Sequence, residues 1–290
     1  MNAVKISTHP PSGTIILNRP DKRNALNRAL LVELREALHQ LMMEPSVRAV
    51  ILTGAGTAFC AGMDLNEMYQ TSQQEDALAR WHEDAVLYRD LLLAMLEFPK
   101  PIIAAVNGAA VAGGAGLVLA SDLVVAAEDA QFGLPEPRRG IVAGMVAPLL
   151  HFRAGGGHAS YLLLSARIVS AQEAVRMGIF HDLVRSDLVW ARAHQWAGEL
   201  SQSAPEALRM TKEMLNQTIG EHLETLLTAG AAISAAARTT HAAREGLRAF
   251  IEKRPPNWDA EPPEAPPAQR FPVIRKEEPP PEQQDPSLEN

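Results

Sequence analysis

Apolar residues in the first part of the chain alternate between strand-like runs and helical periods. The run GTIILN at residues 13–18 predicts a strand, and the Arg19-Pro20-Asp21 that follows it predicts a turn. Leucines then recur at helical spacing and predict an amphipathic helix over about residues 25–43. The β-branched run VRAVILT at 47–53 predicts a second strand. Strand, helix and strand in this order indicate a βαβ unit with a right-handed crossover.

The middle of the chain continues this alternation. Residues 57–66 predict a loop of small residues that enters a helix. A second apolar face at helical spacing extends from Leu78 to Met95, and Pro99 ends it. The next expected elements are a buried strand at 102–106, a helix at 113–120 and a strand at 122–127.

From Pro148 onward the pattern is mostly helical. Ser170 and Glu173 form a capping-box motif, which predicts a helix that ends near Met177. The remaining expected elements are a loop at Gly155-Gly156-Gly157, a last strand at 180–184, and helices at 187–202, 205–218 and 220–252, with a break near Thr239. We therefore predict an α/β core over residues 1–200 and a helical region over 201–254.

Residues 255–290 differ in composition from the rest of the 290-residue chain. They hold more than half of its 21 prolines and few large apolar residues, which predicts a disordered or polyproline-like segment. Of the net charge of −7, eight acidic and three basic residues in this segment account for −5. The nearly neutral remainder gives no basic face for nucleic-acid binding.

The single cysteine and the hydropathy pattern restrict the possible metal sites, disulfides and cellular location of the protein. Cys60 alone excludes an internal disulfide framework and a cysteine-cluster metal site. No spacing of His, Asp or Glu predicts a metal site either. The chain lacks a signal-like N-terminal region and an apolar run long enough to span a membrane. We therefore expect a cytoplasmic protein without a membrane partner.

Two glycine-rich segments each follow a predicted strand and open a predicted helix: AGMDL at 61–65 and AGG at 112–114. The first N–H groups of a helix have no partner within the helix, and small residues let a ligand approach them. Two such groups that converge on one oxygen form an oxyanion hole, and the nearby carboxylate of Glu136 suits proton transfer. The alternative is that these glycines only permit tight turns between strand and helix.

Five segments carry distinctive motifs: RPDKRNALN (19–27), FCAGMDL (59–65), PIIAAVNGAAVAGGAGLVLASDLVVA (101–126), AQFGLPE (130–136) and EGLRAFIEKRPPNW (245–258). Together they resemble the crotonase, or enoyl-CoA hydratase/isomerase, superfamily over about residues 1–258. The resemblance implies an α/β, crotonase-like fold of repeated ββα units with a helical C-terminal region that assembles trimers or dimers of trimers. It also implies an acyl-CoA thioester substrate, with coenzyme A as part of that substrate and no separate cofactor.

The same resemblance implies roles for individual residues. The two oxyanion-hole donors fall on the backbone N–H groups of Met63 and Gly113, and the proton-transferring glutamate falls on Glu136. Typical hydratases of the family use a second glutamate, which here falls on Gly116 and therefore has no side chain. The candidates for binding the CoA part are Lys22, Arg23, Ala61, Asp64 and Lys253.

Other polar residues near these motifs have alternative interpretations. Asp64 could instead only stabilise the start of a helix, and the cations could be ordinary solvated charges. Arg138, Arg139 and His151 are candidates for contact with a substrate carboxylate or water, and Asp122 for a structural hydrogen bond.

One glutamate leaves the reaction open. We expect an enzyme that stabilises a thioester enolate, most simply a hydratase in which Glu136 alone activates water, similar to methylglutaconyl-CoA hydratase-like members. A Δ3-Δ2-enoyl-CoA isomerase is the first alternative, with Glu136 moving a proton between the α and γ carbons. Thioester hydrolysis, decarboxylation, or CoA-ester binding without catalysis are the others.

Overall fold

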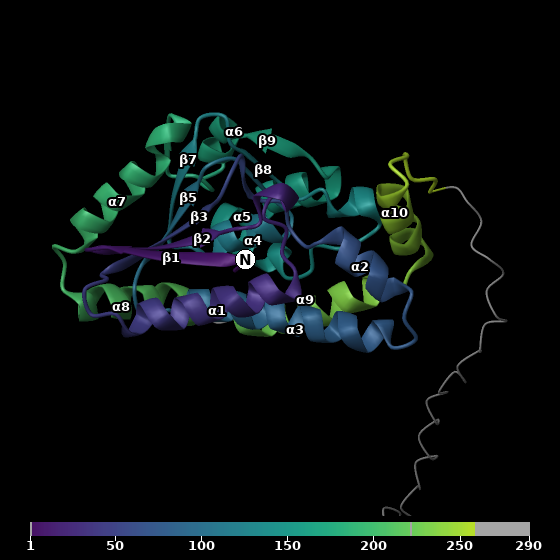
Figure 1. Cartoon of the computed structure of the whole chain (residues 1–290), viewed down its shortest axis with the longest axis horizontal. Helices are drawn as coiled ribbons and strands as arrows, with labels where there is room; N and C mark the ends of the chain where they lie inside the picture. The colour runs from purple at the N-terminus through teal and green to yellow at the C-terminus, as the bar shows by residue number, and fades with distance from the viewer. Residues whose placement is uncertain (1, 221, 259–290) are drawn as a thin grey trace, which may run out of the picture. The chain divides into compact units, whose positions relative to one another are not determined.

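Two β-sheets form the centre of the fold, and the structure, a computed structural model, describes residues 2–220 and 222–258 (Figure 1). Within these residues the larger sheet has six strands in the order β1-β2-β3-β5-β7-β10. They are β1 (Val4–His9), β2 (Ser12–Leu17), β3 (Ala49–Gly54), β5 (Ile102–Val106), β7 (Leu123–Ala127) and β10 (Asp182–Val184). Within the described part of this sheet only β1 and β2 pair antiparallel, and the central strand β5 is wholly buried, as a parallel strand covered on both faces should be.

The smaller sheet has four strands of three residues each, in the order β4-β6-β8-β9, over the same described residues. They are β4 (Ala58–Cys60), β6 (Ala109–Val111), β8 (Gln131–Gly133) and β9 (Ile168–Ser170). Strands β4, β6 and β8 each follow a strand of the larger sheet and precede a helix. The chain therefore repeats a ββα unit, which confirms the predicted fold class.

Helices cover both faces of the larger sheet (Figure 1). Helix α1 (Arg28–Met43) packs against β1 and β2, and α7 (Val189–Leu200) packs against β3, β5 and β7 from the other side. The other helices are α2 (Leu65–Ser72), α3 (Ala77–Leu96), α4 (Gly113–Ala120), α5 (Val146–Ser165), α6 (Ala171–Arg176), α8 (Pro205–Glu213), α9 (Leu223–Ala237) and α10 (His241–Ile251). Short 3₁₀-helices are η1 (Pro20–Lys22), η2 (Glu136–Arg139) and η3 (Ser186–Leu188).

Local sequence signals explain several helix boundaries. Asn27 caps α1 by accepting a hydrogen bond from the Leu30 N–H, and the leucines predicted to form its apolar face are buried. Ser170 and Glu173 form the predicted capping box at α6. The predicted break near Thr239 is confirmed, because α9 ends at Ala237 and Thr240 caps α10.

Three sequence-based expectations need correction. The helix predicted at 205–218 is α8 followed by a π-helical turn, Met214–Ile219. The loop predicted at Gly155-Gly156-Gly157 is too long, because only Gly155, with φ 77°, is non-helical and kinks α5, whereas Gly156 and Gly157 are helical. Strand β4 lies inside the segment predicted to be an irregular loop, 57–66.

The C-terminal part of the described chain is helical, as predicted, and comprises α8, α9 and α10. The predicted Pro-rich segment at 255–290 falls outside the described residues from 259 onward. The predicted boundary at residue 200 stays a prediction. Among the described residues no helix is long and apolar enough to cross a membrane.

Candidate active site

A cavity of about 400 Å³ collects most of the predicted site residues. Its wall draws on helices α2, α3, α4, α9 and α10 and on the 3₁₀-helix η2. Of the residues predicted from sequence, it is lined by Arg23, Ala61, Met63, Gly113 and Glu136. Apolar side chains, among them those of Met68, Val142, Val146 and Phe250, make up much of the rest. The cavity therefore combines apolar walls with a few polar groups, as ligand sites usually do.

The first candidate donor is the N–H of Gly113, the first residue of α4. The residue before it, Ala112, has φ 52° and ψ −126°, a conformation that a residue with a Cβ adopts only under strain. A side chain on Gly114 would collide with the Cys60 carbonyl oxygen at 2.3 Å, so the helix can start this close to β4 only with glycine there. Among the described residues the Gly113 N–H has no hydrogen-bond acceptor.

The second candidate donor is the N–H of Met63, in the loop between β4 and α2. Leu26 holds this loop on both sides, because its N–H donates to the Gly62 carbonyl and its carbonyl accepts from the Asp64 N–H. The Met63 N–H between them has no acceptor in the described part of the chain. A Cβ on Gly62, which has φ 85°, would lie 3.0 Å from the Gly113 nitrogen. A Cβ on Gly113 would in turn lie 3.6 Å from the Met63 nitrogen, so the two unpartnered N–H groups lie close together.

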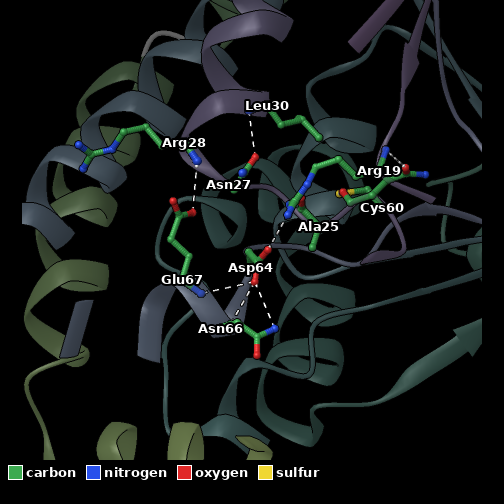
Figure 2. Close-up of polar contacts among 10 residues, drawn as sticks. Arg19, Ala25, Asn27, Arg28, Leu30, Cys60, Asp64, Asn66 and Glu67 are labelled. Carbon is green, nitrogen blue, oxygen red and sulfur yellow. Dashed lines mark hydrogen bonds and ion pairs between the residues drawn. The ribbon is translucent and has the colours of Figure 1, made fainter. Parts of the chain in front are cut away.

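Asp64 holds the start of α2 rather than lining the cavity (Figure 2). Its carboxylate accepts hydrogen bonds from the N–H groups of Asn66 and Glu67 and forms an ion pair with Arg19 at 3.0 Å. Burial opposes ionisation of Asp64, but the Arg19 guanidinium and the two N–H donors outweigh it and lower its pKa. Asp64, which directly follows Met63, is therefore a charged N-cap that fixes the start of α2.

Glu136 begins η2 and is only 6% exposed. Its Oε2 atom is buried and has no hydrogen-bond partner among the described residues. Burial raises the pKa of this carboxyl to about 7. A carboxyl with a pKa near neutral can take up a proton and return it in the same reaction.

Tyr88 on α3 explains the missing side chain at Gly116. A Cβ on Gly116 would lie 2.1 Å from the Tyr88 hydroxyl oxygen and 3.2 Å from a methyl of Val146. The hydroxyl donates a hydrogen bond to the Gly113 carbonyl at 2.5 Å and thereby ties the first turn of α4 to α3. Burial, with smaller contributions from Cys60 and Glu136, raises the pKa of Tyr88 well above its usual value, so it stays a neutral donor. A glutamate at position 116 has no room while Tyr88 keeps this position.

The predicted CoA-binding residues are only partly brought together. The Ala61 N–H donates to the Arg23 carbonyl at 3.0 Å, which joins these two segments at the edge of the cavity. Lys22 is exposed beside Arg23, and Lys253 is exposed after the end of α10; neither lines the cavity. A contribution of these two lysines to binding stays a prediction.

Of the remaining candidates, two line the cavity and two do not. Arg138 and Arg139 line the cavity, and the Arg139 guanidinium lies over the Phe250 ring at 5.3 Å. His151 is exposed on α5 and does not line it. Asp122 accepts a hydrogen bond from the Ile102 N–H and one from Lys212, the structural role expected for it.

Among the polar residues that line the cavity, Tyr88, Ser234 and Arg238 were not predicted from the sequence as site residues. Tyr88 falls within the apolar helical face predicted from Leu78 to Met95, and Arg238 lies in the break between α9 and α10. The helical period of α3 does point Tyr88 inward. No pattern in the sequence distinguishes Arg238 from the exposed arginines around it.

Comparison with known proteins identifies the family of the chain. The profile of the enoyl-CoA hydratase/isomerase family matches residues 13–261. A Thermus thermophilus protein that carries the name enoyl-CoA hydratase is 41% identical over 244 residues, 84% of this chain and 96% of the relative. The 2,3-dehydroadipyl-CoA hydratase of Escherichia coli is 38% identical, over 84% of this chain and 93% of its own. The crystal structure of an enoyl-CoA hydratase/isomerase from Xanthobacter autotrophicus superimposes with a TM-score of 0.79 at 30% identity, covering 87% of this chain and 97% of that one.

Proposed function

The chain belongs to the enoyl-CoA hydratase/isomerase family, and from that premise we propose that it hydrates α,β-unsaturated acyl-CoA thioesters with a single glutamate, Glu136. One observation carries the proposal. A buried carboxyl with a pKa of about 7 lines the same cavity as two unpartnered backbone N–H groups, those of Met63 and Gly113. The name of the Escherichia coli relative, a hydratase of an unsaturated CoA ester, supports the same reaction.

The two N–H groups would bind the thioester carbonyl oxygen. Their hydrogen bonds strengthen as that oxygen becomes an enolate, so they stabilise the transition state more than the substrate. Each donor of this kind contributes about 3–4 kcal/mol. Because only backbone atoms take part, a methionine at position 63 serves as well as another residue.

Glu136 would move the protons of the reaction. As a carboxylate it accepts a proton from a water molecule while the water oxygen forms a bond to the β carbon. The electron pair of the double bond moves into the thioester, and the enolate oxygen is held by the two N–H groups. Protonated Glu136 then donates its proton to the α carbon, which completes the addition of water and regenerates the carboxylate.

The test is the replacement Glu136→Gln, which keeps the shape of the side chain and removes the base. We expect kcat for hydration of short 2-enoyl-CoA esters to fall by about 10²- to 10⁴-fold, the usual contribution of a general acid–base group. Binding of the ester should change little. Glu36→Gln, at an exposed glutamate of α1, is the matched control and should keep full activity. Unchanged turnover in the Glu136→Gln variant would show that Glu136 takes no part in the mechanism.

Isomerisation is the second candidate, because Glu136 is the single carboxylate among the described residues that line the cavity. One carboxyl suffices to carry a proton from the α carbon of a 3-enoyl-CoA to its γ carbon. A panel of 2-enoyl, 3-enoyl and branched glutaconyl-type CoA esters separates the two reactions, because a hydratase yields a 3-hydroxyacyl product and an isomerase a shifted double bond. Either reaction should incorporate solvent deuterium at the α carbon. We expect this incorporation with the native protein and not with the Glu136→Gln variant.

We also propose how the CoA part is held. Arg23 and Ala61 line the cavity and would contact coenzyme A directly. The exposed cations Lys22 and Lys253 would bind the phosphates of coenzyme A. Asp64 would act indirectly, by fixing the loop that carries Met63. No cofactor is needed beyond the coenzyme A of the substrate.

Assembly and location belong to the same proposal. We propose a homotrimer or a dimer of trimers in the cytoplasm. Large apolar side chains are exposed on α8 and α9, including Met210 at 61% and Ile233 at 55%, and they support burial against another subunit. Cys60, the only cysteine of the chain, is buried and free, as suits a reducing compartment.

A further inference from the structure

A buried arginine that lies outside the five motif segments lines the candidate active site. Arg238 follows the last residue of α9 and is 4% exposed. It lines the same cavity as Glu136, Met63 and Gly113. Ser234, one helical turn earlier on α9, lines the cavity too and is also buried.

The guanidinium of Arg238 is not satisfied by the chain. Its Nη1 atom is buried and has no hydrogen-bond partner within residues 2–220 and 222–258. Burial lowers the pKa of Arg238 to about 10, against an opposing effect of Asp84, so the group is still a cation at neutral pH. A buried cation with an unused donor is costly unless a ligand pairs with it.

The carboxylate of Asp84, which acts on the pKa of Arg238, is already engaged. Asp84 on α3 accepts hydrogen bonds from two nitrogens of Arg28, at 2.9 and 2.7 Å. Glu83 and Glu67 also face Arg28 rather than Arg238. Arg238 therefore receives some charge compensation from Asp84 but no hydrogen bond from it.

The charged side chains that line the cavity are mostly cationic. Besides Arg238, the cavity is lined by Arg23, Arg138 and Arg139, and Glu136 is the single carboxylate among its described lining residues. Arg23 and Arg138 are exposed and Arg139 is half-buried, so they can meet CoA phosphates or solvent. Arg238 alone among these arginines is fully buried, which suits the enclosed acyl part of the substrate and not its solvated phosphates.

We propose that Arg238 binds a carboxylate carried by the acyl chain, so that the preferred substrates are CoA esters of unsaturated dicarboxylic acids. This assignment rests on the proposed hydratase function and specifies its substrate class. The planar guanidinium can donate two parallel hydrogen bonds to a carboxylate, and the Ser234 hydroxyl can donate a third. The apolar walls formed by Met68, Val142 and Val146 accommodate the methylene groups between the thioester and that carboxylate.

The experiment compares pairs of 2-enoyl-CoA esters of equal length, one ending in a carboxylate and the other in its neutral methyl ester. A series of increasing length identifies the chain that reaches Arg238. We expect the native protein to favour the best carboxylate ester over its neutral partner by at least about 30-fold in kcat/KM, the usual scale for a buried, hydrogen-bonded charge pair.

Arg238→Met should abolish this preference. Its kcat/KM for the carboxylate ester should fall by about 30-fold or more, while that for the neutral ester should change by less than about threefold. Arg238→Lys keeps the charge without the planar fork and should retain part of the preference. Arg244→Met, at an exposed arginine of the neighbouring α10, is the matched control and should behave like the native protein.

Each outcome decides the question. A native protein that hydrates both esters equally well overturns the assignment of the substrate class, even if Arg238→Met fails to fold. An equal loss for both esters in a folded Arg238→Met protein would show that Arg238 is structural. If the native protein hydrates no ester of the series, the proposed function itself fails, a result distinct from a missing preference.

Discussion

At the scale of single residues, the candidate site keeps polar groups in states that the fold alone would not favour. Glu136 is buried without a partner for Oε2, Arg238 is buried without a partner for Nη1, and Ala112 has a positive φ. Each of these features costs stability, and all three lie at one cavity. Strain and unsatisfied groups concentrated at one place are expected where a ligand completes the structure.

The pKa of Glu136 predicts a pH-dependent cost in stability. The folded pKa of about 7 lies above the usual 4.5, so the folded protein binds more protons between these values and loses stability as the pH rises through them. Above neutral pH the charged carboxyl should cost about 3 kcal/mol. Glu136→Gln should therefore raise the free energy of unfolding at pH 8 by about 2–3 kcal/mol and change it little at pH 4.5, as urea denaturation would measure. An equal effect at both pH values would contradict the raised pKa.

The contact between Tyr88 and Gly116 predicts coupled mutations. Gly116→Ala places a methyl group against the Tyr88 hydroxyl and should destabilise the protein by about 1–3 kcal/mol through overpacking. Tyr88→Phe removes the hydroxyl and its hydrogen bond to Gly113, at a cost of about 1 kcal/mol. The double variant should be more stable than the sum of the two costs by about 1 kcal/mol or more.

Chemical denaturation of the four proteins of this cycle measures the coupling. Tyr161→Phe, on α5 and 41% exposed, is the control partner, and its effect should simply add to that of Gly116→Ala. Additive costs for Tyr88 and Gly116 would show that the hydroxyl moves aside, and Gly116 would then not be explained by Tyr88.

At the scale of elements, helices with a long apolar period or a local capping signal could be predicted from the sequence. Elements that form only through contacts between distant parts of the chain could not. Helix α1 and the break between α9 and α10 could be located because apolar periods and capping residues are local signals. The strands of the smaller sheet are three residues long, too short to show a period, and pair only through contacts distant in sequence. The family resemblance supplied Met63, Gly113 and Glu136 as candidates. Tyr88 and Arg238 could not be predicted as site residues, because their place at the cavity depends on how α3 packs against α4 and α9.

At the scale of the whole molecule, the described chain leaves an apolar surface on its C-terminal helices. Met210 on α8 and Ile233 on α9 are large side chains that are more than half exposed. Isolated exposed apolar residues are common, but several on consecutive helices of one region support the proposal that another subunit covers them. The proposed assembly into trimers supplies that cover with copies of the same chain, through closed symmetry.

Ile233→Glu tests this assembly. A charge at an exposed helix position costs the folded subunit little, whereas at a subunit interface it is buried without a partner and costs several kcal/mol. We expect sedimentation equilibrium to show a trimer or hexamer for the native protein and a smaller species for the variant, with unchanged helical content by circular dichroism. Met43→Glu, at the 67% exposed end of α1, is the matched control and should leave the mass unchanged. A native protein that sediments as a monomer would contradict the proposed assembly, and an Ile233→Glu protein of native mass would place its interface elsewhere.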